Sequence, residues 1–350
     1  MPAMKRAKRA LAIGATIGTS LVALAAPAHA DKTPGGGGGS VGSGTASGDS
    51  SGQDVSAEAS GSIVKTDKHN NGTGASVGPL APVGNWTPPA CWYAPKYSAA
   101  DFKKLEEHTW SLESTGYEWD AQQRRHYAEG HPYKDFNLAK ADKGYWWTSD
   151  ADKSYPPGWD SCTKPTFWVD NGSPPPADVP QAVTPEILAE IAYAAVRVPD
   201  THVTLAPNGA TKVNLPTWAW LDKTDFKPVS VRAYVPLTGM NATTTATPTS
   251  LKIEPGTPDA ELYPGSGECT FNGDGSIGTP YVKGDADKTP PCGLTYLRAS
   301  GSDGPYKLKA TITWKISWTG TGQPTPKGLP DGTFGTTQDV TVDEIQAINR

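Results

Sequence analysis

The sequence predicts an α+β protein that is mostly β, with one amphipathic helix ahead of a C-terminal β-sandwich. Three observations support this prediction. The 350 residues include 38 Gly and 33 Pro, which is typical of many turns between short strands. The 12 Trp and 13 Tyr far outnumber the three Met, and aromatic residues favour strands. After Pro199, apolar residues recur at every second position, which is the period of a strand.

Residues 1–30 have the pattern of a cleavable secretion signal. Four basic residues and no acid lie in the first nine positions, an apolar run extends from Leu11 to about Ala26, and Ala28-His29-Ala30 forms a small-x-small end. The apolar run is shorter than the ~20 residues of a stable span, although a retained N-terminal anchor is the alternative. The prediction is a secreted, extracellular protein with no membrane span after cleavage and an expected association with the cell wall.

Residues 31–84 have low complexity and are rich in Gly, Ser, Ala and Asp. Such a segment buries too little apolar surface to offset the entropy lost on ordering. We therefore predict a disordered, flexible tether between the signal and the folded part. A leader without a role of its own is the alternative interpretation.

Residues 85–182 form a predicted Trp-rich module that contains eight of the 12 Trp. A helix over 98–108 is predicted from its Ser start and from Phe102 and Leu105 on one face. A second, polar helix is predicted over 120–129 and ends at Gly130. Short strands are expected at 145–147 and 167–170, before the three prolines at 174–176 close the module.

Residues 183–350 form the predicted helix and sandwich domain. Thr184 is a good N-cap and Pro185 suits the first helical position, so an amphipathic helix should extend to Val198, before Pro199. The clearest strand is 306–318, where seven alternate residues are apolar. This strand would be about 40 Å long, so we expect a bend or a bulge. Further strands are expected at 212–221, 229–235, 251–253, 294–297 and 340–342.

Four cysteines follow the signal, and an even number in an exported protein predicts disulfides. Three pairings are possible. We favour Cys91–Cys162 and Cys269–Cys292, because each pair then lies within one predicted module. No C-x-x-C occurs, so the sequence does not support a redox motif or a zinc ribbon.

Several segments together resemble a family of secreted actinobacterial proteins without an established function. They are 87–93 (TPPACWY), 213–222 (VNLPTWAWLD), 273–275 (GDG) and 311–318 (TITWKISW), with Pro291, Cys292, Tyr296 and Ser300. The later half is also similar to PKD-like, immunoglobulin-type β-sandwiches. Members of the family carry labels such as "enoyl reductase" or "ATP/GTP-binding protein". The resemblance implies a fold and a compartment, and it brings no catalytic residues.

The motifs do not favour those labels. Gly273 to Gly278 match G-x-G-x-x-G, but a dinucleotide site needs a helix after this loop, and Thr279-Pro280 follow instead. No P-loop or G-x-S-x-G elbow occurs. We therefore expect a turn there, with neither NADPH nor ATP/GTP as a cofactor. Asp274, Asp285 and Asp287 are weak calcium candidates, and exposed aspartates in turns are the alternative.

The aromatic clusters are the best candidates for a binding surface. They comprise Tyr145, Trp146, Trp147, Trp159, Trp218 and Trp220. Adjacent tryptophans in a strand point to opposite faces, so one of Trp146 and Trp147 could face solvent and bind a sugar or a peptide. The alternative is that these rings fill the core, where each Trp buries about 200 Å².

The sequence therefore favours a non-catalytic binding or structural protein of the cell envelope or extracellular space. Cleavage of the signal removes four basic residues and lowers the net charge from −5 to −9, which argues against nucleic acid as a partner. A cell-wall polymer, a polysaccharide or an envelope protein is expected instead. The alternative is a secreted hydrolase acting on wall or plant polysaccharide, for which the neighbouring acids Glu113, Glu118 and Asp120 would be candidates.

Overall fold

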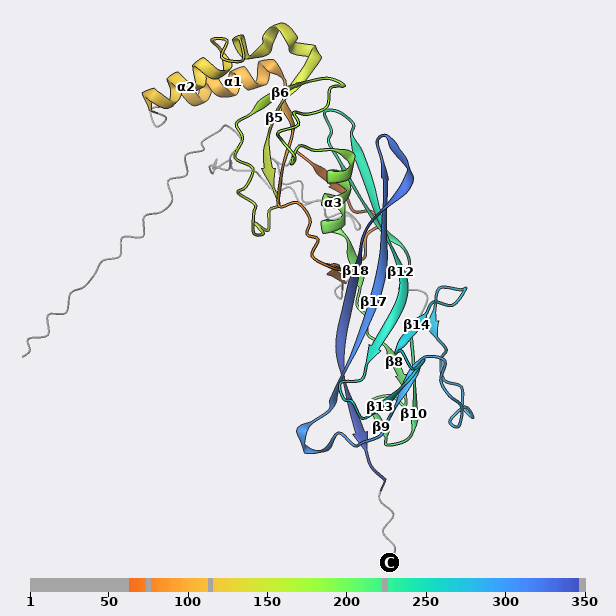
Figure 1. The fold of residues 1–350 in the computed structure, drawn as a ribbon. Coiled ribbons are helices and arrows are strands. Elements are labelled where there is room, and N and C mark those ends of the chain that lie inside the picture. Colours follow the sequence, from red (N-terminus) through yellow and green to blue (C-terminus); the bar gives the residue numbers. More distant parts are fainter. Residues whose placement is uncertain (1–62, 74–76, 113–115, 222–225, 346–350) are drawn as a thin grey trace, which may run out of the picture.

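The computed structural model describes residues 63–73, 77–112, 116–221 and 226–345. The predicted secretion signal and most of the predicted tether lie outside these residues. The described chain is mostly β, as predicted, with antiparallel sheets and a few helices. Figure 1 shows an elongated molecule in which three long strands run between a helical cap at one end and a group of short strands at the other. Among the described helices, none is long and apolar enough to cross a membrane.

The largest sheet has eight strands in the order β1-β11-β12-β17-β18-β3, while β14 pairs with β12 and β9 pairs with β18. Its strands are β1 (Lys65–Asp67), β3 (Ala81–Pro82), β9 (Ala210–Lys212), β11 (Val229–Tyr234), β12 (Asn241–Glu254), β14 (Glu268–Thr270), β17 (Tyr306–Gly320) and β18 (Gln323–Asp343). A five-stranded sheet has the order β13-β16-β10-β15, with β8 beside β10. Its strands are β8 (Thr204–Ala206), β10 (Pro216–Leu221), β13 (Ala260–Tyr263), β15 (Ile277–Gly278) and β16 (Gly293–Tyr296).

Strand β17 confirms the predicted period of two. Along the predicted face, every residue from Leu308 to Trp318 is buried, and Tyr306 is partly buried. Helix α3 (Pro185–Ala195) packs on β11, β12 and β17, and the five-stranded sheet shares the same core cluster near the other end. The expected irregularity is present, because the register shifts between Trp314 and Ile316 on β17 and between Pro248 and Ser250 on β12.

The predicted strand 212–221 is divided into β9 and β10. Asn214 has a left-handed backbone (φ 62°), which interrupts the extended conformation of a strand, and its N–H donates to the carbonyl of Tyr296 at 2.8 Å. Pro216 therefore begins β10, and the predicted edge or kink is a turn between two strands.

The Trp-rich module is built on a three-stranded sheet, β4-β5-β6. Its strands are β4 (Cys91–Tyr97), β5 (Gly144–Ala151) and β6 (Phe167–Asp170). One face carries the helical cap, which consists of α1 (Ala99–Trp110), α2 (Tyr117–Tyr127) and the 3₁₀ segment η1 (Asp135–Lys143). Ser98 caps α1 as predicted, since its hydroxyl accepts from the Asp101 N–H at 3.1 Å. The other face of the sheet packs into the same core as α3.

The module boundary predicted at residues 182/183 is therefore not a boundary between cores. Trp92, Tyr93 and Trp147 lie in one continuous cluster with Leu188 of α3 and Ile316 of β17. The bridge between Tyr93 and Ala182 adds a backbone connection. The two predicted modules thus share one core, while the immunoglobulin-type or PKD-like identity of the later half stays a prediction.

The predicted tether boundary at residue 84 is too late, because part of residues 63–84 is folded. Ile63 and Val64 are buried, β1 pairs with β11, and β3 pairs with β18. The strand β2 (Val77–Pro79) pairs with β7 (Arg197–Pro199). The composition of this segment does not reveal these contacts. A short edge strand can pair with a strand of an existing sheet through only two or three residues.

Helix α3 ends three residues earlier than predicted, at Ala195. The side chain of Asn71 donates to the Ala195 carbonyl at 3.0 Å and accepts from the Arg197 N–H at 2.7 Å. These bonds satisfy the end of the helix and hold Arg197 to Pro199 in an extended conformation. Val198 therefore belongs to β7 and not to the helix.

Candidate functional site

The aromatic residues that the sequence favoured for binding are mostly core residues. Trp146, Trp147 and Trp218 are 0%, 5% and 5% exposed, respectively, and Tyr145 and Trp220 are partly buried. The prediction of a binding face on these residues is therefore wrong for the three buried tryptophans, and the alternative of core packing is confirmed for them.

Trp146 and Trp147 point to opposite faces of the sheet, as expected, but both faces are covered. Trp146 packs edge-on against Tyr127 and Trp168, and its indole N–H donates to the Phe136 carbonyl at 3.1 Å. Trp147 stacks on Phe167 within the core shared with α3. The helical cap on one side and α3 on the other leave neither ring to solvent.

An exposed aromatic pair lies instead on the loop between β5 and β6. Tyr155 is 63% exposed and Trp159 is 42% exposed. Their ring centroids are 5.1 Å apart and their planes meet at 78°, so the edge of one ring contacts the other. We call Tyr155 and Trp159 the aromatic pair. Singly exposed aromatic residues are common, whereas two that contact each other on one short loop form a defined surface.

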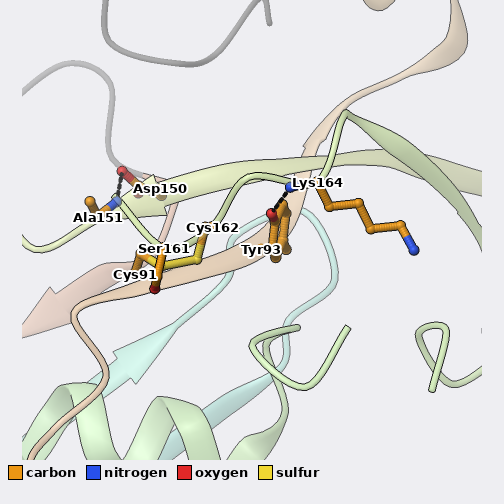
Figure 2. Close-up of a disulfide and its surroundings, with 7 residues drawn as sticks. All are labelled: Cys91, Tyr93, Asp150, Ala151, Ser161, Cys162 and Lys164. Carbon is orange, nitrogen blue, oxygen red and sulfur yellow. Dashed lines mark hydrogen bonds between the residues drawn. A yellow bond between two sulfur atoms is a disulfide. The ribbon is translucent and has the colours of Figure 1, made fainter. Parts of the chain in front are cut away.

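The loop is tied to the sheet at both of its ends. At one end, the Asp152 N–H donates to the Ala90 carbonyl at 2.9 Å. At the other, the disulfide Cys91–Cys162 joins the loop to the start of β4, with the Cα atoms 6.1 Å apart. Figure 2 shows this disulfide beside Ser161, whose hydroxyl lies 3.3 Å from the Cys91 sulfur.

The chain just beyond the disulfide is fixed as well. The Lys164 N–H donates to the Tyr93 hydroxyl at 2.6 Å (Figure 2). Tyr93 is only 1% exposed and packs against Phe167. The anchor of the loop is thus a core residue, which limits how far the loop can move.

Successive turns inside the loop present the aromatic pair. The Asp152 carboxylate accepts from both the N–H and the hydroxyl of Ser154, at 2.8 and 2.6 Å, which is an Asx-turn. Tyr155 then has φ +49°, a left-handed conformation that is costly for a bulky side chain. Gly158, with φ +91°, reverses the chain and brings Trp159 back against Tyr155.

Sequence reasoning considered Trp159 but missed Tyr155. A signal was present, since both residues lie in a stretch of Lys, Ser, Pro, Gly and Asp that has no apolar periodicity. A Trp or Tyr in such a stretch does not belong to an apolar face that packs into the core. The nearby Cys162 indicates where a disulfide attaches the stretch to the rest of the protein.

The G-x-G-x-x-G segment is a hairpin turn, as expected. It joins β14 to β15 and begins no helix. Its tip is closed by Asn272, whose N–H donates to the Ser276 carbonyl at 2.8 Å, and by Asp274, which accepts from the Ser276 N–H at 3.0 Å. A shallow pocket lies beside the tip, and three of the polar side chains that line it, those of Asn272, Asp274 and Ser276, already bond within the turn.

The three aspartates suggested for calcium do not form a site. Within the described chain, no group of three or more His, Cys, Asp or Glu side chains could hold a metal ion. Asp274 serves the hairpin turn, and Asp285 pairs with Lys288 at 2.9 Å. The described structure therefore does not bring Asp274, Asp285 and Asp287 together as a set of ligands.

Two of the acids suggested for a hydrolase, Glu118 and Asp120, lie in the first turn of α2. Glu113 lies outside the described residues. Asp120, on α2, acts electrostatically on Glu106 of α1, and burial together with Asp120 raises the pKa of Glu106 to about 8. Sequence analysis did not single out Glu106. This carboxyl is 0% exposed, so a polymer has no access to it.

No family model matches the chain. Neither a curated protein nor a solved structure is significantly similar to it.

Proposed function

We propose that this chain is a secreted, non-catalytic binding protein of the cell envelope, and that the aromatic pair holds a glycan. The observation that carries the proposal is the aromatic pair itself, two contacting and exposed rings on a loop that a disulfide and a buried tyrosine fasten to the core. The resemblance to secreted actinobacterial proteins supports the same compartment.

A sugar suits this surface because aromatic faces accept the C–H-bearing face of a pyranose ring through dispersion contacts. The two ring planes are nearly perpendicular, so together they form a corner that can hold a single sugar residue. Coplanar rings would instead form a flat platform that suits a crystalline surface. The exposed residues around the pair include the polar Lys153, Ser154 and Asp160, which can hydrogen-bond to hydroxyl groups.

A proline-rich peptide is the other ligand that stacks on exposed aromatic rings. Such peptides occupy extended grooves lined by several aromatic side chains. Among the described residues from 140 to 180, Tyr155 and Trp159 are the large hydrophobic residues classed as exposed. The short extent of the pair therefore favours a sugar.

The two disulfides fit an extracellular protein. Cys91–Cys162 and Cys269–Cys292 both have ordinary geometry, with Cα–Cα distances of 6.1 and 5.7 Å, and the described residues include no free cysteine. Disulfides persist in oxidising compartments. An envelope location also supplies glycans in abundance, which agrees with the proposed ligand.

The test is co-sedimentation of the full chain with insoluble peptidoglycan, chitin and cellulose, with released sugar measured in the supernatant. We expect at least one polymer to deplete the protein without sugar release. Trp159→Ala and Tyr155→Ala should each weaken binding about tenfold, since a well-used contact ring contributes roughly 1–2 kcal/mol.

Tyr117→Ala is the matched control, because Tyr117 is 88% exposed and lies on the helical cap. This variant should bind like the unchanged chain. Binding that survives loss of both loop rings would refute the aromatic pair as the site, and sugar release by the unchanged chain would favour the hydrolase. Capture of a proline-rich peptide in place of every polymer would replace the glycan with a peptide.

A further inference from the structure

A glutamate interrupts the buried face of α1. The buried residues of this helix are Ala99, Phe102, Glu106 and Trp110, which recur at the spacing of a single helical stripe. Glu106 is 0% exposed. Neither of its carboxylate oxygens has a hydrogen-bond partner among the described residues. A charged group placed in this way would be strongly destabilising.

Helix α2 places a second carboxylate near Glu106. Asp120 of α2 acts electrostatically on it, and elsewhere on α2 the side-chain oxygen of Gln123 is buried with no hydrogen-bond partner among the described residues. Among the cations of α2, Arg124 has its guanidinium over the Trp110 ring, 4.3 Å from its centre. The helix–helix contact therefore brings a second carboxylate toward Glu106, and no donor among the described residues hydrogen-bonds to either of its oxygens.

The other elements that pack on α1 do not neutralise Glu106. Lys103 of α1 pairs with Glu107 and with Asp135 of η1. On β4, Lys96 lies over the Tyr97 ring, and the Asp150 carboxylate of β5 accepts from the Ala151 N–H. On η1, Lys140 pairs with Asp170.

The histidine of α2 is a further titratable group of the cap. His126 of α2 packs edge-on against Tyr127 and Tyr133, and burial lowers its pKa. His126 is therefore held neutral near pH 7, and it offers Glu106 no compensating charge. Protonation of His126 would weaken the cap on acidification, which is opposite in sign to the effect expected of Glu106.

We propose that α1 and α2 form a pH-sensitive clasp, which is closed while Glu106 holds its proton and opens when Glu106 ionises. Opening places the carboxylate in water and separates α2 from the buried stripe of α1. It also uncovers the aromatic face formed by Phe102, Trp110 and Tyr127. The clasp lies on the helical cap and is independent of the glycan proposal.

The direction in which pH shifts the clasp follows from proton binding to Glu106. The pKa of Glu106 is about 8 in the folded chain and 4.5 as its ordinary value, so between these limits the folded state holds a proton that the opened state releases. Rising pH therefore favours opening across this window. The equilibrium constant for opening increases by at most about tenfold per pH unit. Below about pH 4.5 the contribution of Glu106 to the stability of the closed clasp is fully present, and above about pH 8 this contribution is lost.

The test is hydrogen–deuterium exchange of the full chain at pH 5, 6, 7 and 8, with labelling times corrected for the intrinsic exchange rate. We expect peptides from α1 and α2 to lose protection as the pH rises, while peptides from β17 do not. Glu106→Gln should remove this dependence, because a neutral amide cannot ionise.

Glu107→Gln is the matched control, since Glu107 is the neighbouring exposed acid, and it should behave like the unchanged chain. Glu106→Met removes the polar group and should protect α2 at pH 8 even if Gln packs poorly. A pH dependence that persists in both Glu106 variants overturns the proposal. Restoration of protection at pH 8 by calcium alone also overturns it, because the carboxyls would then hold a cation.

Discussion

At the scale of single residues, Asn71 shows how a segment of low-complexity composition shapes the core. Its side chain bonds to the Ala195 carbonyl and to the Arg197 N–H, and so connects the end of α3 to β7. Strand β7 begins at Arg197, two residues after Ala195, and pairs with β2. One amide side chain thus decides where the best helix of the chain ends.

We predict that Asn71→Ala lowers the free energy of unfolding by about 1–3 kcal/mol, because the mutation leaves a partly buried carbonyl and a partly buried N–H without a partner. Chemical denaturation of the full chain measures this change. Asn70→Ala is the control, since Asn70 is exposed and only its backbone carbonyl is used, by the Ser230 N–H. An equal loss in both variants would show that the effect is not due to the Asn71 bonds.

At the scale of elements, the sequence predicted best where the pattern was long. The alternation in 306–318 identified β17, and the caps and apolar stripe identified α1 and α3. The short edge strands β1, β2 and β3 were missed because two or three residues carry no period. The aromatic residues were placed correctly on strands, but which sheet face is covered depends on elements distant in sequence.

The long strand β18 shows another feature that composition only hints at. Among the described strands, β3 and β9 pair with its outer edge, at Gly332–Thr333 and Thr341–Asp343. The part from Gln323 to Pro330 has no such partner and contains Pro324, Pro326 and Pro330. Proline cannot donate a hydrogen bond, so these residues protect the open edge from pairing with another chain.

The loop of the aromatic pair is likewise held by an interaction between distant elements, the Cys91–Cys162 disulfide. We predict that Cys91→Ala with Cys162→Ala lowers the free energy of unfolding by about 4 kcal/mol, because a separation of 71 residues gives a large loop-closure entropy. The loss for Cys269→Ala with Cys292→Ala should be about 3 kcal/mol, since that separation is 23 residues.

Glycan binding should separate the two disulfide variants further, under conditions in which both remain folded. Loss of Cys91–Cys162 frees one end of the aromatic loop and should weaken binding, while loss of Cys269–Cys292 should leave it unchanged. Co-sedimentation measures the difference. Equal binding by both variants would mean that the turns of the loop and the Tyr93 anchor suffice to position the rings.

At the scale of the whole molecule, one core unites parts that the sequence divided into modules. Thr244 of β12 is 0% exposed and donates its hydroxyl to the Ala189 carbonyl of α3 at 2.7 Å. Trp86 stacks on Tyr193 of α3, with ring centroids 5.0 Å apart. The three-stranded sheet, α3 and the long strands therefore depend on one another, and the strands β1, β2 and β3 close this core from the outside.

Because the parts depend on one another, two truncated chains that begin at Ile63 and at Asn85 should differ in stability. A chain that begins at Ile63 retains β1, β2, β3 and Asn71, whereas a chain that begins at Asn85 lacks them all. The shorter chain exposes the outer edge of β11 and the Phe334 ring, which lies directly against Gly78. It also leaves the Arg197 N–H and the Ala195 carbonyl without Asn71.

We expect the chain from Ile63 to unfold in a single cooperative transition, and the chain from Asn85 to lose several kcal/mol or to fail to fold, because three strand pairings and part of the core are removed. Thermal unfolding followed by circular dichroism compares them, and Asn71→Ala in the longer chain separates the helix-end contribution from the strand pairings. Equal transition temperatures would mean that the core closes without residues 63–84 and would restore the boundary at Asn85 that composition indicated.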